Sequence, residues 1–165
     1  MLDTIDSNQT WEQLKLDKIN FKLELKIITH DNVTEHPFVN ISLNGYPKFG
    51  EVCDKDTVVE IDVEIEDDTE NFLTIEYNNK IARHDVVLGE DGVPVLDKRV
   101  EIIGMYIDDV KLDTNALVNP DAITFTPIDP EGVSTTGFDA TKLAWNGKTT
   151  LRFTTPIYIW LLENL

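Results

Sequence analysis

Four short segments of the chain alternate apolar residues with polar or charged ones, at residues 21–27, 39–43, 59–65 and 73–77. Side chains on a β-strand point to opposite faces in turn, so each segment offers one apolar and one polar face. This period of two predicts an all-β fold, an antiparallel β-sandwich. The Asn44–Gly45 pair favours a tight primed turn, which predicts that the second and third of these strands are neighbours.

In the second half of the chain, apolar and polar residues alternate less clearly. Residues 100–110 have apolar residues at both odd and even positions, so both faces of a strand would be apolar, which predicts a central strand. Gly104 within it indicates a bulge or a close backbone approach. Residues 147–156 predict a last strand. Between these segments, prolines and glycines at 119–137 exclude a central strand, although 122–125 fits a brief edge strand.

The last residues, 157–165, are strongly apolar. We expect a short C-terminal helix opened by Thr155–Pro156, or an extended tail. Apolar surface left in water costs about 25 cal/mol per Å², so this terminus must pack on its own domain or insert into another subunit.

The length of 165 residues, with 41% hydrophobic content, suits one domain with one core. Residues 1–18 are polar apart from a few side chains such as Trp11, which predicts an N-terminal arm. The single sandwich domain is expected at 19–165, with a long loop at about 113–147.

The chain is acidic, with 31 acidic and 14 basic residues and a formal net charge of −17. Such a surface repels phosphate backbones and anionic lipids, so neither nucleic acid nor a membrane is an expected partner. The acidity fits high solubility, adaptation to a salty medium, or cation binding.

Cys53 is the one cysteine, so no intramolecular disulfide can form, and we expect it to be a buried small apolar side chain. The first residues lack the basic and apolar regions of a secretory signal, and no stretch of about 18 apolar residues could cross a bilayer. The protein is expected to be made in a host cytoplasm without a signal peptide and to leave it in a particle released by lysis.

Sequence motifs for catalysis are missing. There is no nucleophile elbow, phosphate loop, paired zinc-ligand spacing or calcium-hand pattern. His30, His36 and His84 are poorly placed beside candidate nucleophiles, and we interpret them as ordinary loop residues. With 31 carboxylates, any apparent pair is expected by chance. The protein is not expected to be an enzyme.

The elements at 20–112 follow one another in a particular order: a strand, a loop, a strand ending in Asn44–Gly45, an alternating strand, a strand ending in Asn78–Asn79, a loop to Asp97 and a central strand. This order resembles the calcium-dependent, xylan-binding type of carbohydrate-binding module. The resemblance implies a jelly-roll-like sandwich whose loop oxygens surround a Ca²⁺ ion that meets sugar hydroxyls. The ligands it implies are Asn79, Asp85, Asp91 and Asp97.

The chain departs from that family where Lys98–Arg99–Val100 replaces the Arg-Asn-Leu that follows the aspartate, and where Asn79 replaces an aspartate. Exposed aromatic residues in turn-rich stretches would favour glycan recognition, for example of a surface polysaccharide. Core packing is the alternative for each of them. The candidates are Tyr46, Phe49, Phe138 and Trp145.

The C-terminal sequence carries a second resemblance. Trp145–Asn146–Gly147, followed by residues 151–163, looks like the ending of uncharacterised, virion-associated proteins of large tailed phages. The resemblance implies a virion component such as a capsid decoration, neck, tail or fibre-associated protein.

These features lead to two hypotheses about function. The first is a non-enzymatic structural or assembly subunit of a phage particle, bound to other virion proteins or to further copies of itself. The alternative is a calcium-dependent glycan-binding module that mediates attachment to a host surface. The first hypothesis assigns subunit contacts to apolar residues near the two termini, although Trp11 and Leu14 could instead cover the edge of their own sandwich. These residues are Trp11, Leu14, Tyr158, Trp160, Leu161 and Leu165.

Overall fold

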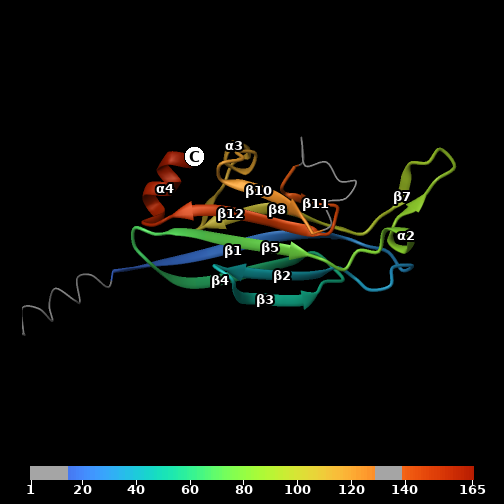
Figure 1. The fold of residues 1–165 in the computed structure, drawn as a ribbon, viewed down its shortest axis with the longest axis horizontal. Helices are drawn as coiled ribbons and strands as arrows, with labels where there is room; N and C mark the ends of the chain where they lie inside the picture. Colours follow the sequence, from blue (N-terminus) through green and yellow to red (C-terminus); the bar gives the residue numbers. More distant parts are fainter. Residues whose placement is uncertain (1–14, 129–138) are drawn as a thin grey trace, which may run out of the picture.

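Two antiparallel sheets stack face to face in the computed structural model, which confirms the predicted all-β sandwich (Figure 1). The structure describes residues 15–128 and 139–165. Among the candidate residues, Trp11, Leu14 and Phe138 lie outside these ranges. All four segments with a period of two are strands.

The first sheet has the order β11 (Lys142–Leu143), β8 (Arg99–Ile107), β1 (Leu16–Ile28) and β4 (Thr57–Glu66), and β9 (Val110–Lys111) also pairs with β8. The strand expected at 100–110 is therefore central, as predicted. It ends at Ile107, where a turn through Asp108 and Asp109 leads back into β9.

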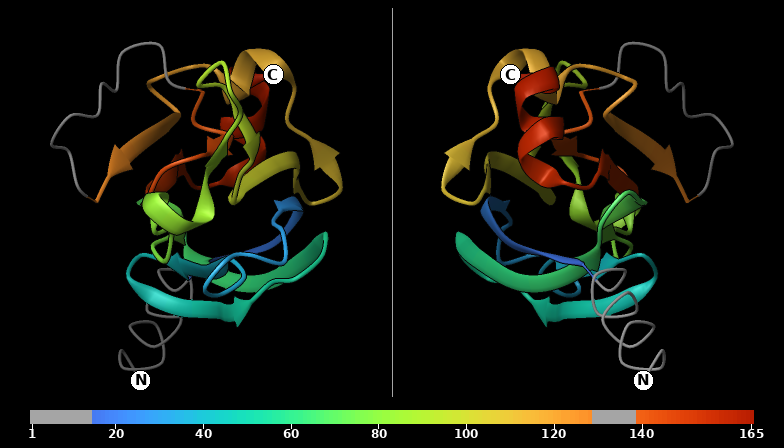
Figure 2. Two further views of the ribbon diagram at one scale, coloured as in Figure 1. Left: turned by 90° about the vertical axis from the view of Figure 1, so that its right-hand side faces the viewer. Right: turned by 90° about the vertical axis from the view of Figure 1, so that its left-hand side faces the viewer.

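The second sheet has the order β10 (Ile123–Pro127), β12 (Gly147–Thr154), β5 (Glu70–Tyr77), β2 (Phe38–Leu43) and β3 (Tyr46–Val52). The strand β10 lies at the edge, as its proline predicts, and β12 is the predicted last strand. Figure 2 shows the two sheets viewed along their strands.

Gly104 lies at a bulge in β8. Glu24 pairs with Gly104 and Leu25 pairs with Ile102, so Ile103 is the extra residue of β8. A Cβ atom at position 104 would collide with the Glu24 carboxylate. Both features predicted for Gly104, the bulge and the close approach, are confirmed.

The Asn44–Gly45 turn is confirmed, but its connection is not the one expected. Both residues have positive φ angles, 50° and 84°, as a primed turn requires. The turn joins β2 to β3, and β4 pairs with β1 in the other sheet, so the predicted neighbours at 39–43 and 59–65 are wrong. The sequence pattern missed β3 because this edge strand is largely exposed and contains Pro47 and Gly50.

The core lies between the sheets. Phe21 of β1 and Phe153 of β12 are fully buried, with ring centroids 5.3 Å apart. Trp160 of the C-terminal helix α4 (Ile157–Asn164) continues this aromatic contact, 6.5 Å from Phe153. The short helix and the burial of Cys53 are both as predicted.

The domain boundaries need two corrections. β1 begins at Leu16, which pairs with Glu66, so the expected arm at 1–18 includes the start of a core strand. The polar Lys15, Asp17 and Lys18 hid this start because the end of β1 is largely solvated. The expected loop at about 113–147 contains β10, β11 and a short helix α3 (Thr114–Leu117).

A separate hairpin follows β5. A short helix α2 (Ala82–Asp85) leads into β6 (Val87–Leu88) and β7 (Pro94–Leu96), which pair with each other and with neither large sheet. In Figure 1 this hairpin projects from the end of the sandwich opposite α4. Within the described ranges, no helix is long and apolar enough to span a membrane.

Candidate interaction surfaces

The hairpin β6–β7 exposes an unusual amount of apolar surface. Four of its side chains are exposed and apolar, and we call them the hairpin surface: Leu88, Val93, Val95 and Leu96. A two-stranded hairpin alone is at best marginally stable in water. Its position therefore depends on what holds its base.

A buried ion pair fixes the base of the hairpin. The side chains of Lys98 and Asp85 are fully buried, and the Lys98 ammonium lies 3.5 Å from Asp85 Oδ2. The ammonium also donates to the backbone carbonyl of Asn79 at 2.6 Å. Asp85 accepts in addition from Ile81 N at 2.6 Å, so its carboxylate joins the start of α2 to the strand after the hairpin.

A second group of charges surrounds this pair. The Lys80 ammonium donates to Asp97 Oδ1 and to the Ala144 carbonyl, at 2.7 Å each. Arg99 donates to the other oxygen of Asp97 at 3.2 Å and to Glu101 at 2.8 Å. Both ends of the hairpin are thus tied to the sandwich by charged hydrogen bonds. We call the group of Lys80, Asp85, Asp97, Lys98 and Arg99 the anchor.

Burial sets the electrostatics of the anchor. It lowers the pKa of Lys98, against the opposing effect of Asp85, which favours the charged amine. Burial also raises the pKa of Tyr77, as do the charges of Asp85 and Asp97. For Arg99, burial works to lower the pKa, and the hydrogen bonds to Glu101 and Asp97 outweigh it, so that the pKa is raised.

Two of the four residues implied as calcium ligands, Asp85 and Asp97, belong to the anchor. The side chain of Asn79 accepts from Phe38 N at 3.0 Å and donates to the His36 carbonyl at 2.9 Å. Asp85 and Asp97 bind the cationic side chains of the anchor, whereas Asp91 lies in the hairpin turn and accepts from Val93 N.

At least one side-chain oxygen of each of these four residues accepts a hydrogen bond from the protein. In the part of the chain that the structure describes, no three His, Cys, Asp or Glu side chains form a group that could hold a metal ion. The ammonium of Lys98 supplies a positive charge beside Asp85 and the backbone carbonyl of Asn79. Calcium binding therefore stays a prediction.

The aromatic residues expected to bind glycan do not share one surface. Tyr46 is 72% exposed and follows the β2–β3 turn, whereas Phe49 is partly buried against the core. Trp145 is 45% exposed and lies near the anchor, with the Lys80 ammonium 5.6 Å from its ring centroid. The sheet register places Tyr46 and Trp145 at opposite ends, because Leu43 pairs with Leu73, and Gly147 with Tyr77.

Helix α4 carries the second exposed apolar surface. Of the residues predicted to contact another subunit, Trp160 and Leu161 are buried in the core of their own domain, so that assignment is wrong for them. Residues three and four positions apart share one face of a helix, and Trp160 and Leu161 lie on the same inward face as Ile157. Tyr158 and Leu165 are exposed, and so are Ile159 and Leu162, which the sequence analysis did not name; the subunit contact of Tyr158 and Leu165 stays a prediction. The helix surface consists of Tyr158, Ile159, Leu162 and Leu165.

The two surfaces lie at opposite ends of the sandwich. β5 ends at Tyr77, on the side of α2 and the hairpin, whereas Thr154, just before α4, pairs with Glu70 at the start of β5. The hairpin faces the viewer in one panel of Figure 2, and α4 does so in the other. The apolar run Val93–Pro94–Val95–Leu96 could have pointed to the hairpin surface. The sequence alone does not show that these side chains are exposed, and only the fold reveals it.

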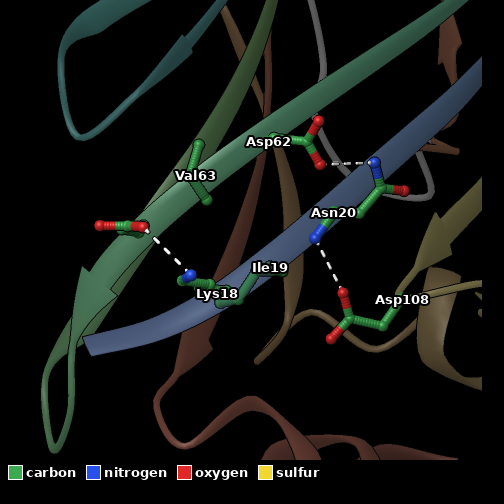
Figure 3. A pocket seen from close by; sticks show the side chains of 7 residues that line it. Lys18, Ile19, Asn20, Asp62, Val63 and Asp108 are labelled. Carbon is green, nitrogen blue, oxygen red and sulfur yellow. Dashed lines mark hydrogen bonds and ion pairs between the residues drawn. The ribbon is translucent and has the colours of Figure 1, made fainter. Parts of the chain in front are cut away.

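A shallow hollow of about 470 Å³ lies on the outer face of the first sheet (Figure 3). Its polar groups bind one another: Asn20 N donates to Asp108 at 2.8 Å, and Asn20 Nδ2 donates to Asp62 at 2.9 Å. Lys18 and Glu64 form an exposed ion pair at 3.8 Å. These contacts hold β1 beside β4 and fasten the turn after β8.

Two of the histidines have structural contacts. His30 Nε2 donates to the Asp85 carbonyl at 2.7 Å, and His36 Nδ1 is hydrogen-bonded to Thr29 Oγ1 at 3.0 Å. Both fasten the loop between β1 and β2 beside the anchor. His84 is exposed on α2.

Replacing Lys98 with methionine should destabilise the fold by about 3–5 kcal/mol, because Asp85 then stays buried without a cation. The double variant K98M/D85N should recover part of this loss, since no buried charge remains. Urea unfolding measures both. The control is Lys18→Met, which breaks an exposed ion pair and should change stability by less than about 1 kcal/mol. A K98M variant as stable as K18M would contradict the assigned role of the anchor.

The buried phenol of Tyr77 should make the protein less stable at high pH. Its hydroxyl donates to the Lys98 carbonyl at 3.0 Å, and its raised pKa keeps it protonated when the phenol of the unfolded chain ionises. Between pH 10 and pH 11 this difference should lower the free energy of unfolding by about 1 kcal/mol.

Tyr77→Phe should lack that decrease, as urea unfolding at the two pH values can measure. Both proteins retain Lys98, whose lowered pKa changes stability in the opposite direction, so its effect cancels in the comparison. If the free energy of unfolding fell equally between the two pH values in the wild type and in the variant, ionisation of Tyr77 would not be the cause of the decrease.

Comparisons with protein-family models, curated protein sequences and solved structures found no match to this chain.

Proposed function

We propose that the protein is a non-enzymatic structural subunit of a larger protein assembly, held in place by apolar contacts at both of its ends. The observation that carries this proposal is the pair of exposed surfaces, on the hairpin and on α4, at opposite ends of a rigid sandwich. Six of the eight residues of α4 are apolar, and its own domain covers only the face formed by Ile157, Trp160 and Leu161.

The energetics favour such contacts. Fully burying one large aliphatic side chain is worth about 1.5–3 kcal/mol, and each surface offers several. Leu162 is 78% exposed and Val95 63%. A net charge of −17 opposes close approach of other acidic proteins across the remaining surface, so uncharged patches are the places where contact costs least.

The resemblance of the C-terminal sequence supports a particular assembly, the virion of a large tailed phage. Under this proposal the chain is a capsid decoration, neck, tail or fibre-associated protein. The acidic sandwich without disulfides is compatible with that role.

Leu162→Glu should lower the fraction of protein that co-sediments with the phage particle by about tenfold or more, because it buries a charge in the contact. The matched control is Val58→Glu, at an apolar residue on the outer face of β4 that is 61% exposed against 78% for Leu162, and it should co-sediment like the wild type. Circular dichroism should confirm that both variants fold. A wild-type protein that stays a monomer and finds no partner in a native particle lysate would contradict the proposed function.

Glycan binding is the alternative, and the half-exposed Trp145 beside the anchor is the observation that favours it. Isothermal titration with millimolar calcium should give no heat, because each candidate side chain already accepts a hydrogen bond from the protein, and Asp85 and Asp97 are paired with lysines. Calcium-dependent signal on a glycan array, with the protein displayed in many copies, would support the alternative, and its loss in Trp145→Ala would locate the site.

A further inference from the structure

We propose that the outer edge of β4 binds an extended segment of another protein, which joins the first sheet as an additional antiparallel strand. The segment that fits this edge alternates apolar with polar residues and carries basic residues at two of its polar positions. This inference concerns a side of the sandwich, whereas the proposed function rests on its two ends.

β4 is a long and regular edge strand. It lies at the end of the first sheet, pairs with β1 alone among the described strands, and keeps one continuous register with β1 over its 10 residues. Unpaired backbone groups along such an edge are a template for another strand, so proteins commonly shorten, interrupt or cover their sheet edges.

The other edges of the two sheets are shortened or interrupted in this way. β3 contains Pro47 and Gly50, and its pairing with β2 is irregular. β10 ends at Pro127, and β9 and β11 have two residues each. Of the edges that the structure describes, β4 alone is long and contains no proline, glycine or bulge.

The direction of the backbone groups of β1 follows from its contacts with the turn after β8. Asn20 N donates to Asp108 Oδ1, and Asn20 O accepts from Asp108 N, at 2.8 Å each. Successive residues of a strand turn their N–H and C=O groups to opposite sides. The backbone groups of Ile19 and Phe21 therefore face β4.

The same alternation determines which groups of β4 face outward. Ile61 pairs with Phe21, and Val63 with Ile19, so the backbone groups of Ile61 and Val63 bind β1. The residues between and beside them turn their N–H and C=O groups away from β1, where no other described residue binds them. These residues are Val58, Glu60, Asp62 and Glu64.

The charges of β4 select the kind of strand that fits. Glu60 and Glu64 are exposed on the outer face of the sheet. β1, on the other side of β4, has Lys22 opposite Glu60 and Lys18 opposite Glu64. Opposite charges on directly paired residues stabilise a sheet, whereas like charges destabilise it. An added strand with basic residues at the same two positions is therefore favoured, and pairing with the β4 of a second copy is opposed.

β1 leaves both carboxylates available to a second neighbour. The Lys22 ammonium lies over the ring of Tyr106, 4.3 Å from its centroid, and Glu60 forms no ion pair with any described residue. The contact of Lys18 with Glu64 is 3.8 Å long, and the Glu64 side chain is 55% exposed. A basic side chain on the added strand can approach each carboxylate from the open side.

The inward side chains of the added strand also have a place to pack. A hollow of about 340 Å³ is lined by the end of β4 and by the start of β3, and its apolar lining includes Leu43, Val63 and Ile65. Residues of an added strand that lie opposite Val63 and Ile65 point inward, as these two do. Apolar residues between the polar positions therefore fit the edge.

Amide hydrogen exchange of the full chain, followed by NMR, tests whether the edge is open. The amides of Ile61 and Val63 should exchange slowly because they bind β1, and those of Glu60, Asp62 and Glu64 should exchange at least about tenfold faster. Slow exchange of all five amides would show that the edge is already covered and would overturn the proposal.

A synthetic peptide tests whether the edge binds a strand. The probe is Thr-Val-Lys-Val-Thr-Val-Lys-Val-Thr with blocked ends, and its binding is measured by fluorescence anisotropy at physiological salt. Bound peptide should slow exchange at the amides of Glu60, Asp62 and Glu64. No binding, or binding that leaves these amides unprotected, would overturn the proposal.

Backbone methylation of the peptide separates strand pairing from charge attraction. In an antiparallel pair with β4, the N–H groups of the lysine and threonine residues point to β4, and those of the valines point away. N-methylation of the two lysines should weaken binding by about tenfold or more, and N-methylation of two valines should leave it within about threefold. The opposite result, or equal binding of both peptides, would overturn the antiparallel arrangement.

Asp62→Pro is the matching change in the protein, because it removes an N–H that points outward and leaves the bonds to β1 in place. It should lower peptide affinity by about tenfold or more. Asp62→Thr, which keeps that N–H, is the control and should bind within about threefold of the wild type. Circular dichroism checks that both variants fold, and equal binding by the two would contradict the assigned edge.

A charge exchange tests the chemistry of the partner without proline. The double variant E60K/E64K should bind the lysine peptide about tenfold more weakly than the wild type, and should prefer a peptide with glutamate in place of both lysines. The wild type should show the opposite preference. Equal affinity of the wild type for the two peptides would overturn the assignment of a basic partner strand.

Discussion

The packing of two apolar sheet faces against each other is the constraint on which this structure depends. Phe21 of β1 and Ile75 of β5 are fully buried, and so is Tyr77, because alternate side chains of paired strands all point to one side. Their neighbours in sequence face solvent, and many are charged. The two sheets cover each other's apolar faces, but the ends of the core between them need other elements to cover them. The elements at the ends, α4 and the hairpin with its anchor, therefore determine what the molecule offers to a partner.

The anchor closes one end with charge rather than with apolar packing. A buried ammonium is costly unless it is paired and hydrogen-bonded, and Lys98 meets both conditions through Asp85 and the Asn79 carbonyl. The sequence predicted a calcium ion among these loops. In the structure the Lys98 ammonium provides positive charge beside Asp85 and the Asn79 carbonyl. The loops can thus be ordered without a metal, and the hairpin that they support keeps a defined direction.

The two ends also differ in how they expose apolar surface. α4 uses Trp160 to close the core and leaves Leu162 in solvent, so one helix both completes the domain and presents a contact. The hairpin is exposed on both sides, and its order comes from the charged residues at its base. In a protein with a net charge of −17, these uncharged areas are where close contact is least opposed. The physical chemistry of the ends thus links the fold to the proposed role in assembly.

The sequence by itself determined the sandwich, because a period of two and a positive-φ turn at Asn44–Gly45 are local properties of the chain. It also determined the bulge at Gly104 and the helix after Pro156. It did not determine which strands pair. The exposed strand β3 does not alternate apolar and polar residues, and the next strand, β4, belongs to the other sheet. Only the tertiary structure decided that Lys98 is buried with Asp85, because their contact joins residues 13 positions apart through a fold that no local pattern encodes. The same holds for the exposed surfaces: apolar residues look alike in sequence, and packing alone decides that Trp160 is inside and Leu162 outside.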